Sequence, residues 1–212
     1  MMACKTRSRW IGRLGSGSTM VEFALVISFT MPLLLYSFEL GFTLSRSIQV
    51  RTVNRDAGSM FVRNIDFSLP VNQQILLRIA KGLGITLTGG NGVLILSQVM
   101  YVGDNECLAG GLQPNTSACP NYNQYVFRKR FVIGNAGLRA SFFGTPSSAV
   151  IAADGSIAGA AYLADASCVA TGFGAFLTMT GGEMSYLSET YQVSASLSLP
   201  GISAGTYARN FF

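Results

Sequence analysis

The sequence predicts an α+β fold in which a long N-terminal transmembrane helix extends into a strand-rich exported domain with a mostly antiparallel sheet. Three observations lead to this prediction. The run from Met20 to Phe38 is apolar apart from Glu22. Charged residues make up only 12 % of the chain, about half the usual share of a soluble domain. The chain is also rich in residues that favour strands and turns, with 24 Gly, 14 Phe and 8 Tyr.

The first element is a basic leader, residues 1–17. Before Gly15 it contains no acid and the following bases: Lys5, Arg7, Arg9 and Arg13. Lys and Arg are retained on the cytoplasmic side of membrane helices, so this leader is predicted to be cytoplasmic. The other basic group, 128–130, would be divided between the two faces of a strand. We therefore expect no nucleic-acid partner.

The second element is a transmembrane helix, residues 18–45. About 20 apolar residues with a rise of about 1.5 Å each are enough to cross the hydrocarbon core of a bilayer. A cleaved secretory signal would have small residues after its apolar core. Here the small residues lie before it, at 15–18, and Arg46 follows it. The lipid bilayer is therefore an expected partner, and residues from about 45 to 212 are expected on the far side of it.

Glu22 has two possible explanations. Thr19 and Glu22 have the spacing of a capping box, and an acid suits the positive end of a helix. Alternatively, a cut after Gly17 would make Ser18 the first residue and Glu22 the fifth. A new amine and a carboxylate are both costly in lipid, so pairing between neighbouring subunits would offset the cost of each.

A basic leader, a glycine and a glutamate at the fifth following position resemble the type IV pilin class of precursors. The finer resemblance is to the TadE-like proteins of the Tad (Flp) pilus apparatus. It rests on Gly17, on VEFAL at 21–25 and on ELG at 39–41. It is close over about 30 residues. Further on, four segments are similar to the strand-rich tail of such proteins: YL at 162–163, GE at 182–183, YLSE at 186–189 and YAR at 207–209.

This resemblance implies a minor pseudopilin, a non-enzymatic component of pilus assembly in a secretion and adhesion apparatus. Its implied partners are a prepilin peptidase, which cuts after Gly17, and other pilins or pseudopilins. Its implied location is the bacterial inner membrane, with a single pass and a periplasmic C-terminal domain. A cut after Gly15 would place Glu22 at the seventh position. The register therefore favours the bond between Gly17 and Ser18, with Glu22 as the assembly carboxylate.

Two other functions remain open. One is an unprocessed, single-pass, membrane-anchored exported protein for binding or adhesion, which differs from the pseudopilin in having no cut at Gly17. The other is a signal-anchored exported enzyme. The chain has no His and no nucleophile motif such as G-x-S-x-G, so we expect no enzyme, no cofactor and no metal site.

Residues 46–90 are expected to form a helical stalk region. Apolar residues continue with roughly helical spacing past Arg46, at Ile48, Val53, Ala57, Met60 and Phe61. Pro70 is a suitable first residue for a second, short helix over 71–81, and Gly82 is its predicted stop.

The strand-rich exported domain is expected over residues 91–212. Apolar and β-branched runs predict strands at 93–102, 125–133, 184–199 and 205–212, with Pro200-Gly201 as the last turn. The Gly-, Ala- and Ser-rich stretch 134–182 gives no clear element.

Cysteine pairing is expected in the exported domain. Cys107 and Cys119 enclose a loop without a regular pattern, LAGGLQPNTSA, and are the favoured disulfide. Cys168 is then either a buried small apolar residue or a thiol that reaches another subunit. The acids Asp104, Glu106 and Asp154 are interpreted as turn residues rather than calcium ligands.

Overall fold

A computed structural model describes residues 16–115, 117–193 and 205–212. The chain forms two compact units, Met1–Phe42 and Thr43–Phe212, and the division falls inside helix α1 (Ser16–Val62). The expectation that the first helix continues well past Arg46 is confirmed.

The described part of the first unit is the N-terminal portion of α1. Its apolar side chains are exposed, from Met20 at 76 % to Phe42 at 62 %. Hydroxyl groups along it bond to carbonyls of the preceding turn, as Ser28 Oγ does to Ala24 O at 2.7 Å and Ser37 Oγ to Leu33 O at 2.7 Å. These side-chain hydroxyls therefore find partners within the helix itself, which is what an apolar medium requires.

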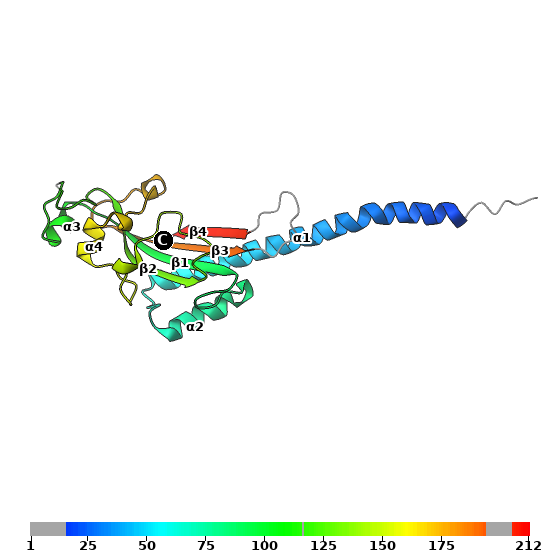
Figure 1. Cartoon of the computed structure of the whole chain (residues 1–212), viewed down its shortest axis with the longest axis horizontal. Coiled ribbons are helices and arrows are strands. Elements are labelled where there is room, and N and C mark those ends of the chain that lie inside the picture. Colours follow the sequence, from blue (N-terminus) through cyan, green and yellow to red (C-terminus); the bar gives the residue numbers. More distant parts are fainter. Residues whose placement is uncertain (1–15, 116, 194–204) are drawn as a thin grey trace, which may run out of the picture. The chain divides into compact units, whose positions relative to one another are not determined.

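The second unit is built on a four-stranded antiparallel sheet (Figure 1). The strands are β1 (Gly92–Tyr101), β2 (Tyr125–Gly134), β3 (Met184–Val193) and β4 (Gly205–Phe211), and their order is β2-β1-β3-β4. All three neighbouring pairs are antiparallel. The predicted α+β class and the antiparallel sheet are thus confirmed.

One face of the sheet is covered by two helices. The C-terminal part of α1 and helix α2 (Pro70–Ile79), which continues as a 3₁₀ turn at Ala80–Leu83, pack on it. The shared core consists mainly of Val50, Val53, Ala57, Phe61, Phe67, Leu76, Leu83, Leu94, Leu96, Phe131 and Ile133. At this end of the packed part of α1, Val50 is fully buried and Ile48 is 58 % exposed.

Residues 46–90 are helical over most of their length, in α1, α2 and the 3₁₀ turn that follows α2. They belong to the same compact unit as the sheet, and the expected boundary at residue 90 is not a boundary between units. An amphipathic helix buries its apolar stripe against a neighbouring layer, and here that layer is the sheet itself.

Helix α1 approaches the sheet closely at two positions one turn apart. Asn54 is fully buried, and its Oδ1 accepts a hydrogen bond from Thr190 Oγ1 at 2.8 Å. Its backbone carbonyl accepts one from Ser188 Oγ at 3.0 Å. At Gly58, a Cβ would lie 2.8 Å from Ser188 Oγ and would also meet the Phe212 ring. Glycine at this position leaves room for the Phe212 ring and the Ser188 hydroxyl against the helix backbone.

The opposite face is covered by residues 135–183. This segment contains the short helix α4 (Gly159–Ala164), which the sequence analysis did not predict. The core on this side includes Val99, Phe127, Tyr162, Leu163, Phe143, Phe173 and Leu187. Helix α4 has only six residues and buries Tyr162 and Leu163, so packing rather than a long periodic pattern accounts for it.

The two edge strands differ in how they are covered. Beyond β2, Arg130 N–H donates to Gly155 O at 2.8 Å and Ile157 N–H donates to Arg128 O at 2.9 Å. At its start, Ala170 N–H donates to Tyr125 O at 2.7 Å. The outer edge of β2 is therefore occupied by later segments of the chain. For β4, the described residues show backbone pairing with β3 alone.

The predicted strands agree closely in position with the four strands of the structure. The third is described up to Val193, so the rest of that prediction and the Pro200-Gly201 turn lie outside the described residues.

Candidate functional site

The predicted processing and assembly residues lie on one helix. Gly17, Ser18 and Glu22 all belong to α1. Ser18 and Glu22 are four residues apart, which is about one helical turn of about 6 Å. Glu22 is exposed, and so are its apolar neighbours Val21 and Phe23, at 61 % and 65 %. In the described part of the helix up to Phe38, the carboxylate is thus the single charged group on an exposed apolar surface.

The capping-box explanation for Glu22 is wrong. That interpretation requires Thr19 to be the residue just before the helix. The helix instead begins at Ser16, so Thr19 lies within it and Glu22 lies beyond its first turn. A helix-terminus role therefore does not explain the position of this acid.

The helix that contains these residues meets the length and composition of a membrane span. From Thr19 it is 44 residues long, with a mean hydropathy of 1.8 in its most apolar part, and none of that part is buried. This is compatible with a single-pass membrane anchor.

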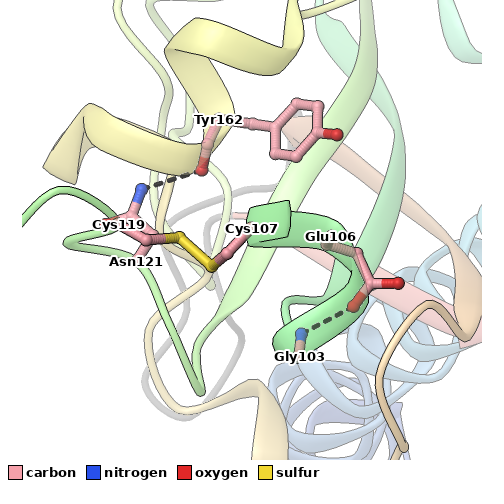
Figure 2. Close-up of a disulfide and its surroundings, with 6 residues drawn as sticks. All are labelled: Gly103, Glu106, Cys107, Cys119, Asn121 and Tyr162. Carbon is pink, nitrogen blue, oxygen red and sulfur yellow. Dashed lines mark hydrogen bonds between the residues drawn. A yellow bond between two sulfur atoms is a disulfide. The ribbon is translucent and has the colours of Figure 1, made fainter. Parts of the chain in front are cut away.

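The two cysteines favoured by the sequence form a disulfide in the structure (Figure 2). Their Cα atoms are 6.0 Å apart, and both side chains are buried. Cys107 belongs to a short helix, α3 (Asp104–Ala109), so the expectation of a wholly irregular loop is wrong at its first end. Two residues after Cys119, Asn121 anchors the other end of the loop.

Both ends of this disulfide loop are fixed by further hydrogen bonds (Figure 2). Glu106 Oε2 accepts from Gly103 N–H at 2.8 Å and so caps α3. Asn121 Nδ2 donates to Tyr162 O at 2.8 Å and to Asp165 O at 2.9 Å. The loop is thereby tied to helix α4 as well as to itself.

Two of the acids that were compared with calcium ligands, Glu106 and Asp154, act in local turns. Glu106 is the cap just described. Asp154 accepts hydrogen bonds from the Ser156 hydroxyl at 2.6 Å and the Ser156 N–H at 3.0 Å, and these bonds lower the pKa of Asp154. Across the described ranges, no group of three or more potential ligand side chains could hold a metal ion.

Cys168 is fully buried in the core on the 135–183 side. Burial raises the pKa of its thiol, and nearby Asp165 raises it further. Of the two interpretations of this cysteine, the buried apolar residue agrees with the structure. A thiol in this position does not reach a neighbouring subunit.

A buried polar cluster that sequence reasoning missed lies under the 135–183 segment. Glu189 is 1 % exposed, and its carboxylate accepts hydrogen bonds from the Ser141 and Tyr207 hydroxyls and from Phe142 N–H, the last at 2.9 Å. Burial, and then the bond to Glu189, raises the pKa of Tyr207. Burial lowers the pKa of Arg130 to about 10, and the charge of Glu189 opposes that change.

Beside this cluster, Arg209 of β4 is surrounded by aromatic rings. Its guanidinium carbon lies 4.3 Å from the Phe176 ring centroid and 4.7 Å from that of Phe142. Such contacts are favourable for a cation and need no ion pair. Both rings are half exposed, so this arginine marks an apolar and cationic surface.

No family model, no curated protein and no solved structure matches the chain.

Proposed function

We propose that this protein is a minor pseudopilin, an assembly component of a Tad (Flp)-type pilus apparatus, and that a prepilin peptidase cuts it after Gly17. The observation that supports this most is the placement of Glu22. It lies on the exposed apolar part of a continuous helix whose later part packs on an antiparallel sheet.

The cut would create a free amine on Ser18. An ionised group at the centre of a bilayer costs about 2.5–3.5 kcal/mol on insertion scales, so an uncompensated amine and carboxylate both oppose burial in lipid. Ser18 of one subunit and Glu22 of the next would neutralise each other when the helices lie side by side. Such pairing makes processing a condition for assembly, because the uncut chain has no amine at this depth.

The bond to be cut lies in the first turn of α1. A peptidase needs an extended backbone, so this turn has to unwind before the cut. Gly17 favours the unwinding, since glycine costs a helix about 1 kcal/mol relative to alanine. It also permits close approach of the enzyme to the backbone.

The first experiment tests the cut. N-terminal sequencing of the protein from its native membrane should begin at Ser18. Gly17→Leu should leave the precursor uncut. Gly41→Leu is the matched control, because Gly41 is in the same helix with open space around it, and this variant should be cut normally. A native N-terminus that still reads Met-Met-Ala-Cys would refute the proposal and leave the unprocessed membrane-anchored protein.

The second experiment tests the carboxylate. Glu22→Ala should be cut but should yield no fibres, and Glu22→Asp should recover part of the assembly. Glu39→Ala, which removes the other acid of the same apolar stretch, is the control. Fibres are counted by electron microscopy. Normal fibre numbers from Glu22→Ala would contradict the pairing role even if the cut after Gly17 is observed.

A further inference from the structure

Among the described residues, nothing pairs with the backbone groups along the outer edge of β4. Tyr186 and Phe212 exchange both backbone hydrogen bonds, at 3.0 and 2.9 Å. In an antiparallel ladder such pairs alternate with pairs that do not bond to each other. The N–H and C=O groups of Tyr207, Arg209 and Phe211 therefore point away from β3. An exposed edge of this kind is a template for a further strand.

A groove runs between this edge and α1. Its volume is about 410 Å³, and it is lined by Arg51, Arg55, Tyr207, Ala208, Arg209 and Asn210. Arg51 and Arg55 are exposed and lie on successive turns of α1. Their side chains have no ion pair within the described ranges, and the sequence 194–204 contains no acid that could supply one. The groove is thus cationic along one wall.

The other side of the β4 edge is apolar. Phe142 is 55 % exposed and Phe176 is 49 % exposed, and both rings contact the guanidinium of Arg209. The Nη1 atom of Arg209 is buried without a hydrogen-bond partner among the described residues. A strand added to β4 would therefore face arginines on one side and aromatic rings on the other.

We propose that the β4 edge binds an extended segment of a partner protein in which acidic and apolar residues alternate. Alternate side chains of a strand are about 6.8 Å apart on one face. Arg51 and Arg55 are separated by about 6 Å along the helix, so acids at two successive alternate positions match them. The intervening apolar residues would cover Phe142 and Phe176, and the backbone would pair with β4.

Two other occupants fit less well. A lipid headgroup would neutralise the arginines but would leave the strand edge unpaired. A second copy of this chain, paired through β4, would bring its own Arg51 and Arg55 to the same edge, where like charges repel. The proposed binding does not require a cut after Gly17, so it can fail or succeed independently of the proposed function.

The test uses the full chain in zwitterionic lipid nanodiscs. The probe is a fluorescent ten-residue peptide in which glutamate alternates with valine. Fluorescence anisotropy should show saturable binding, and amide hydrogen exchange at Tyr207, Arg209 and Phe211 should slow when the peptide is present. A peptide with lysine in place of glutamate should not bind.

Charge-reversal variants show whether the peptide binds at the groove that Arg51 and Arg55 line. R51E/R55E should weaken binding by about tenfold or more. R63E/R78E carries the same change in net charge on exposed arginines outside the groove, and it should bind as the native chain does. Near-UV circular dichroism shows whether both variants keep the native packing.

Several results would overturn the proposal: no binding of the glutamate peptide, equal binding of the lysine peptide, or unchanged exchange along β4. A lipid role is tested by repeating the measurement in nanodiscs with anionic lipid. If R51E/R55E alters the association of the exported unit with anionic lipid but leaves peptide binding unchanged, the arginines serve the membrane surface instead.

Discussion

At the scale of single residues, Asn54 shows how α1 is held in register on the sheet. The side chain is fully buried, its Oδ1 is bonded to Thr190, and its Nδ2 is buried without a partner among the described residues. An unsatisfied buried polar atom is costly, whereas replacing both partners by apolar groups of similar shape can be nearly neutral. We therefore expect the free energy of unfolding to fall more when one residue of the pair is replaced than when both are replaced by apolar residues.

Thr190→Val should destabilise the fold by about 1–3 kcal/mol, because it leaves Asn54 Oδ1 buried and unpaired. Asn54→Leu combined with Thr190→Val should cost less than Thr190→Val alone. The stabilities of the native chain, the two single variants and the double variant are measured by thermal unfolding in detergent micelles, with near-UV circular dichroism as the signal. Simple addition of the two single costs would contradict this account, because it would mean that the side chains do not interact.

The candidate residues differ in how visible they are in the sequence. Glu22 stands out because it is the single charge in an apolar run, and Gly17 is found by its spacing from Glu22. The cluster around Glu189 could not be predicted. Ser141 and Tyr207 reach it from segments 48 and 18 residues away in the chain, and no local pattern records which distant segments meet.

At the scale of secondary-structure elements, Gly58 decides how closely α1 can approach β3. Alanine is the better helix former, so Gly58→Ala would stabilise an isolated helix by about 1 kcal/mol. In this fold the added methyl group would lie 2.8 Å from Ser188 Oγ, and overpacking of this kind costs about 1–3 kcal/mol.

Gly58→Ala should therefore lower the thermal stability of the unit Thr43–Phe212. Gly41→Ala is the matched control, since nothing lies within 4 Å of a Cβ at that position, and it should be neutral or slightly stabilising. Both variants are compared by thermal unfolding in the same micelles. Equal unfolding temperatures for the two variants would contradict this account, because they would show that α1 can move away from the sheet without a loss of stability.

The disulfide between Cys107 and Cys119 closes a loop with a sequence separation of 12 residues. Closing a loop of this size stabilises the native state by about 3 kcal/mol in the chain-entropy model. Replacing both cysteines by serine should lower stability by up to that amount and should speed amide exchange between α3 and Asn121 more than in β1. Mass spectrometry of a non-reduced digest checks the pairing. Free, alkylatable Cys107 and Cys119 in exported protein would refute it.

The elements that the sequence predicted best are the strands. Their apolar and β-branched runs are bounded by glycines, as at Gly92 and Gly134. The strands of the structure begin or end at these same glycines. The short helices α3 and α4 were missed because six residues are too few for a helical period to be recognised. They are held by burial of Cys107, Tyr162 and Leu163.

At the scale of the whole molecule, the chain is expected to have its two ends on opposite sides of the membrane. The basic leader and the apolar length predict that residues 1–17 are cytoplasmic and that the sheet unit is outside the cytoplasm. Protease added to spheroplasts should digest epitopes in the C-terminal unit, and in the uncut Gly17→Leu precursor it should spare an epitope placed before Lys5. Protection of the C-terminal unit in intact spheroplasts, with digestion only after lysis, would reverse the assignment.

The contrast between the two edges of the sheet limits how this molecule can assemble. The β2 edge is occupied by later segments of the same chain, at Gly155, Ile157 and Ala170. Growth by strand addition can therefore proceed in one direction only, from β4. If a partner segment binds to β4 as proposed, each chain has one edge for it, and the expected stoichiometry of the complex is one to one. A sheet closed on one side in this way cannot propagate from one copy of the chain to the next by edge pairing, because two copies paired through β4 would present only their covered β2 edges.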